Sequence, residues 1–186
     1  MTQKSSKKTK IFALILMCLL LASCGNQKPL SMKSGEDINR ILSDNFYQIN
    51  TKDMKYYPAK DLIDSAESGV YPSVTVLNGN STSSVIFQYA GLYEIGSKKI
   101  IVKTDSHKYN LKFDSSQIDS NESMLTSNVT ERVLFNVDRK KYDMLKDMAN
   151  SNNTSVMFNG DDQYSFELTR DNKKLLQSFL SCFEED

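Results

Sequence analysis

The segment before Cys24 most constrains what this chain can fold into, because its pattern predicts that it is not part of the folded domain. Four lysines and no acidic residue precede residue 11, and twelve apolar residues then run from Ile11 to Ala22. A bilayer core takes about 20 residues to cross, so this run is too short for a span and matches the apolar region of a secretory signal. Such a signal is cleaved, and the globular fold has to be built from the residues that follow.

The end of the apolar run carries a more specific motif, Leu21-Ala22-Ser23-Cys24-Gly25. It resembles the lipobox of bacterial lipoproteins, in which a leucine and two small residues precede the cysteine to be modified. The resemblance covers residues 1–25 only. It implies cleavage between Ser23 and Cys24, a diacylglycerol on Cys24, and a lipid-anchored location on the extracytoplasmic side of the cell membrane or outer membrane. Two acyl chains anchor a protein stably, at about 0.8 kcal/mol per buried methylene. The alternatives are a plain secretory signal cleaved near Ser23 and a buried core helix.

The rest of the chain has the size and composition of one ordinary domain. We expect a signal peptide over residues 1–23, a polar tether from lipidated Cys24 over residues 24–35, and a single globular domain over residues 36–186. Four of the 23 basic residues belong to the signal, so the mature chain has 19 basic and 23 acidic residues, a net charge of about −4. This acidic balance argues against a nucleic-acid partner, whose binding surface would be basic.

The cysteines leave no internal disulfide to stabilise the domain. Cys18 leaves with the signal and Cys24 carries the lipid, so Cys182 is the one thiol of the mature domain. It lies in the apolar run LLQSFLSCF, which favours a buried and inert thiol over a reactive one.

Three segments show the apolar spacing of helices, at residues 34–45, 138–150 and 169–183. Asp138 is the expected N-cap of the second, and Thr169 or Asp171 that of the third. Pro58 can begin a further short helix, since proline is tolerated at the first helical position.

Alternating apolar and polar residues predict about seven strands, at residues 71–76, 85–89, 98–104, 109–113, 133–137, 155–158 and 164–168. The first four should form an antiparallel meander that begins with a turn at Leu77-Asn78-Gly79-Asn80, and residues 114–130 should be a mobile polar loop. We therefore expect an α+β fold, with a mostly antiparallel sheet of about seven short strands and two to four helices packed on one face.

The single histidine, His107, limits the chemistry available to the domain. In an extended segment Asp105 and His107 face one side and Ser106 the other, and no G-x-S-x-G context surrounds any serine. One histidine and one cysteine are too few for the usual zinc ligands, and the acidic loops lack the spacing of a calcium loop. We predict no catalytic residue, metal or cofactor, and expect His107 to be an exposed turn residue.

Arg139, Lys140 and Lys141 form one unusual local feature. They fall in the first turn of a predicted helix, where cations oppose the helix dipole by a few tenths of a kcal/mol each. They are either a solvated helix end or a small contact patch for lipid head groups or an acidic partner.

These features favour a membrane-anchored bacterial envelope lipoprotein that is a non-enzymatic binding or accessory module. Its expected partners are the membrane, through Cys24, and an envelope protein or a small ligand. One alternative is a membrane-proximal hydrolase that uses carboxylates or a serine with His107. Another is a surface-exposed accessory or exclusion lipoprotein.

Overall fold

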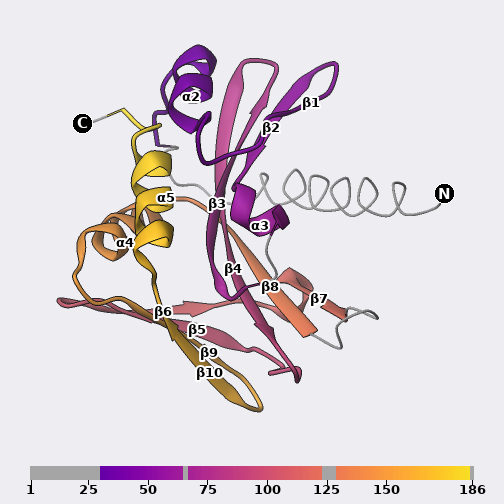
Figure 1. The fold of residues 1–186 in the computed structure, drawn as a ribbon, viewed down its shortest axis with the longest axis vertical. Coiled ribbons are helices and arrows are strands. Elements are labelled where there is room, and N and C mark those ends of the chain that lie inside the picture. Colours follow the sequence, from indigo (N-terminus) through magenta and orange to yellow (C-terminus); the bar gives the residue numbers. More distant parts are fainter. Residues whose placement is uncertain (1–29, 65–66, 123–128, 185–186) are drawn as a thin grey trace.

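The described residues, 30–64, 67–122 and 129–184 of a computed structural model, form an α+β fold. Within them four α-helices accompany ten strands, and every strand pair is antiparallel. The predicted fold class is therefore confirmed. The strands divide between two sheets that meet at a steep angle (Figure 1).

The larger sheet has six strands in the order β1-β2-β3-β4-β8-β7. They are β1 (Ile49–Asn50), β2 (Met54–Pro58), β3 (Gly69–Leu77), β4 (Asn80–Gly91), β7 (Ile118–Glu122) and β8 (Val129–Asn136). The predicted turn between β3 and β4 is confirmed. Asn78 and Gly79 occupy it with φ of 49° and 80°, the positive values that a two-residue type I′ turn requires.

The smaller sheet has four strands in the order β10-β9-β5-β6. They are β5 (Lys99–Lys103), β6 (Lys108–Lys112), β9 (Ser155–Asn159) and β10 (Gln163–Glu167). The predicted four-strand meander is therefore wrong, because β4 and β5 belong to different sheets. The chain changes sheet over residues 92–98, which are held by a buried carboxylate described below.

Four α-helices are described: α2 (Gly35–Leu42), α3 (Lys60–Asp64), α4 (Arg139–Asn150) and α5 (Arg170–Leu180). The side chains of Ser34, Asp138 and Thr169 cap α2, α4 and α5, each accepting a bond from the backbone N–H three residues later. Thr169 rather than Asp171 is thus the cap of α5. Pro58 does not begin a helix, since it is the last residue of β2 and pairs with Ser73.

Part of the predicted polar loop is structured, so that prediction is wrong for residues 115–122 and for residues 129–130, where β8 begins. A 3₁₀ turn, η2 (Ser115–Gln117), leads into β7, which pairs with β8 at the edge of the larger sheet. An edge strand needs only one packed side chain, here Ile118 opposite Val133, so its composition can remain that of a loop. Residues 123–128 lie outside the described part of the chain.

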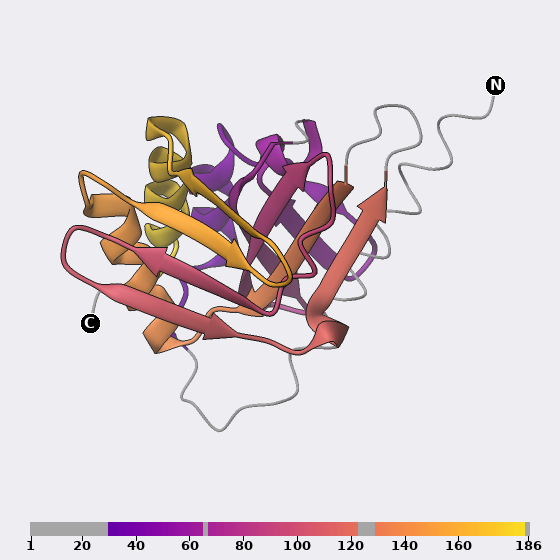
Figure 2. The ribbon, with the colours of Figure 1, turned by 90° about the horizontal axis from the view of Figure 1, so that it is seen from below.

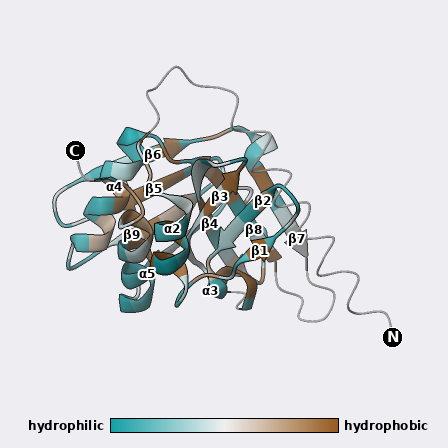
Figure 3. Cartoon of the chain, turned by 90° about the horizontal axis from the view of Figure 1, so that it is seen from above, coloured by the Kyte–Doolittle hydropathy of each residue, from teal (hydrophilic) through white to brown (hydrophobic). Residues whose placement is uncertain are grey.

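The core lies between the two sheets and the helices α2, α4 and α5. Hydrophobic residues follow the central strands, while the helices carry hydrophilic residues on their outer sides (Figure 3). Aromatic contacts join the sheets: Tyr89 on β4 lies 6.2 Å from Phe158 on β9, and Phe113 lies 6.0 Å from Phe135 on β8. Cys182 is fully buried and free, and burial raises the pKa of its thiol to about 12. The predicted buried thiol is confirmed.

The first described residues are held against the last ones. Met32 forms a β-bridge with Phe183, Lys33 N donates to Cys182 O at 2.8 Å, and Glu184 N donates to Ser31 O at 3.0 Å. Residues 31–33, which fall within the predicted tether, are therefore part of the folded unit. They lie at the end of α5 that is farthest from the smaller sheet (Figure 1).

Candidate functional site

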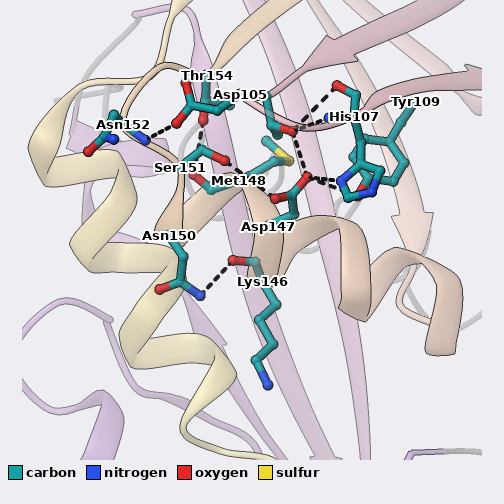
Figure 4. A network of polar contacts seen from close by, with 11 residues as sticks. Asp105, His107, Tyr109, Lys146, Asp147, Met148, Asn150, Ser151, Asn152 and Thr154 are labelled. Carbon is teal, nitrogen blue, oxygen red and sulfur yellow. Dashed lines mark hydrogen bonds and ion pairs between the residues drawn. The ribbon is translucent and has the colours of Figure 1, made fainter.

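A polar cluster gathers around Asp147, in the last turn of α4, and contains the single histidine (Figure 4). Oδ2 of Asp147 accepts from Thr104 Oγ1 at 2.6 Å and Tyr109 Oη at 3.0 Å, and lies 3.0 Å from His107 Nδ1. Ser151 Oγ, just beyond the helix, lies 3.4 Å from the other carboxylate oxygen. These five residues, the Asp147 cluster, join the β5–β6 hairpin to the end of α4.

A second carboxylate strengthens the same junction. Asp105, in the turn between β5 and β6, accepts from the backbone N–H of Asn152 at 2.6 Å and from that of Asn153 at 3.1 Å. Lys173 of α5 donates to the carbonyls of Ser151 and Asn152 at 2.9 Å and 2.6 Å. The segment after α4 is therefore fixed from both sides, by the hairpin and by α5.

Hydrogen bonds to the two carboxylates set their ionisation. Burial raises the pKa of Asp147, but the donors Thr104, His107 and Tyr109 outweigh it, so the pKa lies below the ordinary 3.8. The pKa of Asp105 is also lowered, chiefly by the backbone donors of the segment after α4. Burial, and then the bond to Asp147, raises the pKa of Tyr109 to about 12. The cluster thus holds a carboxylate among fixed donors at neutral pH.

The arrangement bears directly on the hydrolase alternative, because a histidine oriented by a carboxylate can act as a general base. Nδ1 of His107 faces Asp147, which leaves Nε2 directed away from it, and the side chain is 63% exposed. Within the described residues the ring makes one hydrogen bond, to Asp147. The structure therefore brings a carboxylate to His107, and no described hydroxyl or thiol is bonded to the other side of the ring.

A third carboxylate, Glu131 of β8, is almost fully buried, with 1% of its surface exposed. It accepts from the backbone N–H groups of Ile95, Gly96 (2.8 Å) and Ser97 (3.1 Å), and from the Ser97 hydroxyl (2.5 Å). Successive N–H groups of this kind form a small anion-binding nest, and here the protein's own side chain fills it. Glu131 fixes the segment that carries the chain from the larger sheet to the smaller one.

The nest is also packed against the turn between β9 and β10. Asp161 N donates to Ile95 O at 2.9 Å, and a Cβ placed on Gly160 would lie 2.1 Å from the carbonyl oxygen of Gly96. A side chain at position 160 would therefore collide with backbone. Glu131, the nest and this turn form one continuous contact.

The residues singled out from the sequence have different outcomes. The lipidation and cleavage residues, Ser23 and Cys24, lie outside the described residues. Arg139, Lys140 and Lys141 gather at the start of α4: Arg139 Nε lies 3.5 Å from Asp143, Lys141 donates to Asp138 at 2.6 Å, and Lys140 is exposed. Two of the three cations are thus directed toward carboxylates of their own helix.

Sequence reasoning missed both Asp147 and Glu131. Glu131 could have been found from the sequence, because it alternates with Val129, Val133 and Phe135 and so lies on the core side of β8. A charged side chain on that side requires buried partners. Asp147 could not have been found in this way, because a helical aspartate is ordinarily solvated and its partners lie about 40 residues away in sequence.

Comparison with family models, with curated proteins and with solved structures found no match to this chain. The described residues contain no group of three or more His, Cys, Asp or Glu side chains placed to hold a metal ion. No helix in the described part of the chain is both long and apolar enough to span a bilayer.

Proposed function

We propose that this protein is a bacterial envelope lipoprotein, anchored through a diacylglycerol on Cys24, whose domain is a non-enzymatic binding module. The observation that carries the proposal is the pairing of Ser31 and Lys33 with the end of the C-terminal helix. Leu30, the first described residue, lies six residues after the lipobox-like cysteine, and a stretch of six residues spans at most roughly 20 Å. Lipidation at Cys24 would therefore hold the domain close to the membrane surface.

The described polar clusters support a binding module because their donors and acceptors are used within the fold. Glu131 accepts four bonds from the segment between the sheets, and Asp147 fixes a hairpin to a helix end. Both carboxylates therefore have a role in stabilising the fold. We assign partner binding to the outer surface of the domain.

Lipidation is tested by extracting membranes with a detergent that separates into two phases, followed by mass spectrometry of the N-terminal peptide. The expected result is partition into the detergent phase and a diacylglycerol mass on Cys24. A Cys24→Ala variant should lose the lipid mass and remain unprocessed. A free Cys24 thiol, or an N-terminus generated at another residue, would refute the anchor.

The binding role is tested by crosslinking intact cells and recovering the protein from solubilised membranes. A specific partner should be recovered with the native protein. Repeated recovery of the lipoprotein alone would contradict the binding role.

The hydrolase alternative has one specific observation in its favour, the 3.0 Å contact between His107 Nδ1 and Asp147 Oδ2. It is tested by His107→Gln, which retains a polar side chain without a basic ring. If the chain is a binding module, this variant keeps the wild-type cellular phenotype. Loss of the phenotype with unchanged stability would favour the hydrolase.

A further inference from the structure

The outer face of the smaller sheet carries four lysines. Strand pairing places Lys99 opposite Lys112 and Lys103 opposite Lys108 on the adjacent strands β5 and β6, so all four residues lie on one side of the sheet. On the other side of the sheet Ile100 and Val102 are fully buried in the core, whereas on the lysine side Ile101, between Lys99 and Lys103, is 7% exposed. Lys103, Lys108 and Lys112 are exposed and Lys99 is half-buried. These four residues are the lysine face.

No described helix or strand is packed on this face. Figure 2 views the molecule from the side of the smaller sheet, and no described helix or strand lies in front of the four strands. Among the described residues no carboxylate oxygen lies within 4.0 Å of the Nζ of any of the four lysines, whereas Lys98 beside them is paired with Asp161. The four charges are therefore available to a ligand.

The arrangement works against the stability of the sheet. Like charges directly opposite one another on neighbouring strands are destabilising, and this sheet contains two such pairs, one at each end of the β5–β6 ladder. Among the outward positions of the four strands the one acidic residue is Glu167, on β10, two strands away from Lys103. In a mature chain with a net charge of about −4, the face is a local concentration of positive charge.

One end of the lysine face borders an open depression of about 380 Å³. Lys98, Lys99 and Lys112 line it together with Phe113, Gln117 and one carboxylate, that of Asp114. The two lysine pairs are separated by four residues of β5, about 13 Å along the strand. One small anion can contact one pair, whereas a chain of repeated anions can contact both pairs and the depression together.

The residue types indicate which anion suits this face. Planar carboxylates are best matched by the forked guanidinium of arginine, while lysine binds phosphate as a point charge, and no arginine lies at the outward positions of these strands. Those positions also lack aromatic residues, on which the bases of a single-stranded nucleic acid would stack. Phosphate groups without bases are therefore the best match.

The position of the face excludes the anchoring membrane as its simplest ligand. The helix α5 runs from the smaller sheet to Phe183, where Met32 is paired, and its 11 residues span about 16 Å. Residues 31–33 and the strands β5 and β6 that carry the lysine face therefore lie at opposite ends of the domain (Figure 1). The face is directed away from the bilayer that would hold Cys24.

We propose that the lysine face binds a linear phosphodiester polymer of the cell envelope. This inference rests on the proposed function, since an anchored extracytoplasmic domain is what would meet such a polymer. Electrostatic contacts and release of counterions supply the affinity. With four lysines engaged, the logarithm of the association constant should fall with the logarithm of salt concentration with a slope of about −3.

The test measures binding of synthetic poly(glycerol phosphate) to the full processed protein in neutral nanodiscs, across a salt series. One variant carries Lys→Gln at all four positions of the lysine face. Its control carries Lys→Gln at four exposed lysines elsewhere, Lys52, Lys55, Lys146 and Lys174. Each lysine removed from the face should weaken binding roughly five-fold, so the first variant should lose about a hundred-fold or more and its salt slope should collapse. The control should stay within about three-fold of wild type.

Unchanged binding by the lysine-face variant, or no binding by the wild type, would overturn the proposal. Equal or tighter binding of poly-L-glutamate would refute the choice of phosphate, and tighter binding of the nanodisc-held protein to anionic lipid vesicles would assign the face to a membrane. Loss of binding through misfolding is excluded by denaturation of the variant, which should be at least as stable as wild type because both like-charge pairs are gone. If Cys24 carries no lipid but the polymer binds, the anchor fails and this inference stands. The reverse result leaves the anchor and removes the inference.

Discussion

Replacing Glu131 with glutamine should destabilise the domain far more than its conservative chemistry suggests. The carboxylate serves four donors, the backbone N–H groups of residues 95–97 and the hydroxyl of Ser97. One oxygen accepts from Ile95 and Gly96, and the other accepts twice from Ser97. An amide has one acceptor oxygen and one NH₂ group, so it cannot satisfy this arrangement.

The magnitude follows from the better of the two amide orientations. With the amide NH₂ toward Ser97, the serine hydroxyl can rotate to accept from it, but the Ser97 N–H loses its acceptor. A buried unsatisfied donor costs about 1–3 kcal/mol, and the two remaining bonds weaken because the acceptor is no longer charged. Together these give about 2–3 kcal/mol, a large part of the 5–15 kcal/mol typical of a domain. Glu131→Ala, which leaves all four donors without the carboxylate, should cost about 3–5 kcal/mol.

Urea denaturation followed by circular dichroism measures this effect, with the slope of the transition checked for constancy between variants. Thermal unfolding should show a decrease in Tm of roughly 5–10 °C for Glu131→Gln. The matched control is Glu167→Gln, at an exposed position of β10, which should change stability by less than about 0.5 kcal/mol. If the two glutamine variants have the same midpoint, the buried carboxylate does not hold the segment between the sheets.

Three further predictions concern other parts of the domain. Because the folded pKa of Asp147 lies below its unfolded value, the ionised carboxylate stabilises the fold above about pH 4, and this contribution is lost as pH falls through the folded pKa. The Asp147→Asn variant should therefore have a lower urea midpoint than wild type at pH 7, and its midpoint should decline less on acidification. Parallel pH profiles of the two proteins would contradict this. With Cys24 lipidated as proposed, the Cys182 thiol, buried and with its pKa raised to about 12, should react with a thiol reagent only after unfolding. Rapid labelling in native buffer would show that the helix end opens. Substituting glutamine for Lys99 and Lys108, one member of each opposed pair, should raise the free energy of unfolding by a few tenths of a kcal/mol at low salt and by less at high salt. A salt-independent change would have another origin.

The helices could be predicted because their determinants are local. Asp138 and Thr169 cap α4 and α5 as the sequence indicates, and the apolar stripes of both helices are buried. The division of the strands between two sheets could not be predicted in this way. It depends on the contact of Glu131 with residues 95–97, about 35 residues away in sequence, and alternation within a strand contains no information about which sheet the strand joins.

The candidate site was predictable only in part for the same reason. His107 was identifiable as the single histidine, but the carboxylate that orients it comes from a helix 40 residues later. The lysine face illustrates a further difficulty. Lys99, Lys103, Lys108 and Lys112 are ordinary surface residues when each strand is considered alone, and they become a pattern only when the register of β5 against β6 aligns them.

If the chain is exported as we propose, the pairing of residues 31–33 with residues 182–184 has a consequence for the order of events. Residues 31–33 would be among the first of the mature chain to leave the cytoplasm, and the residues that they pair with would be among the last. Contacts between such distant segments form late, because the whole intervening loop has to be closed first. In the lipoprotein that we propose, residues 31–33 would therefore stay unpaired until the C-terminal helix has emerged. Lipidation of Cys24 could then precede closure of the domain.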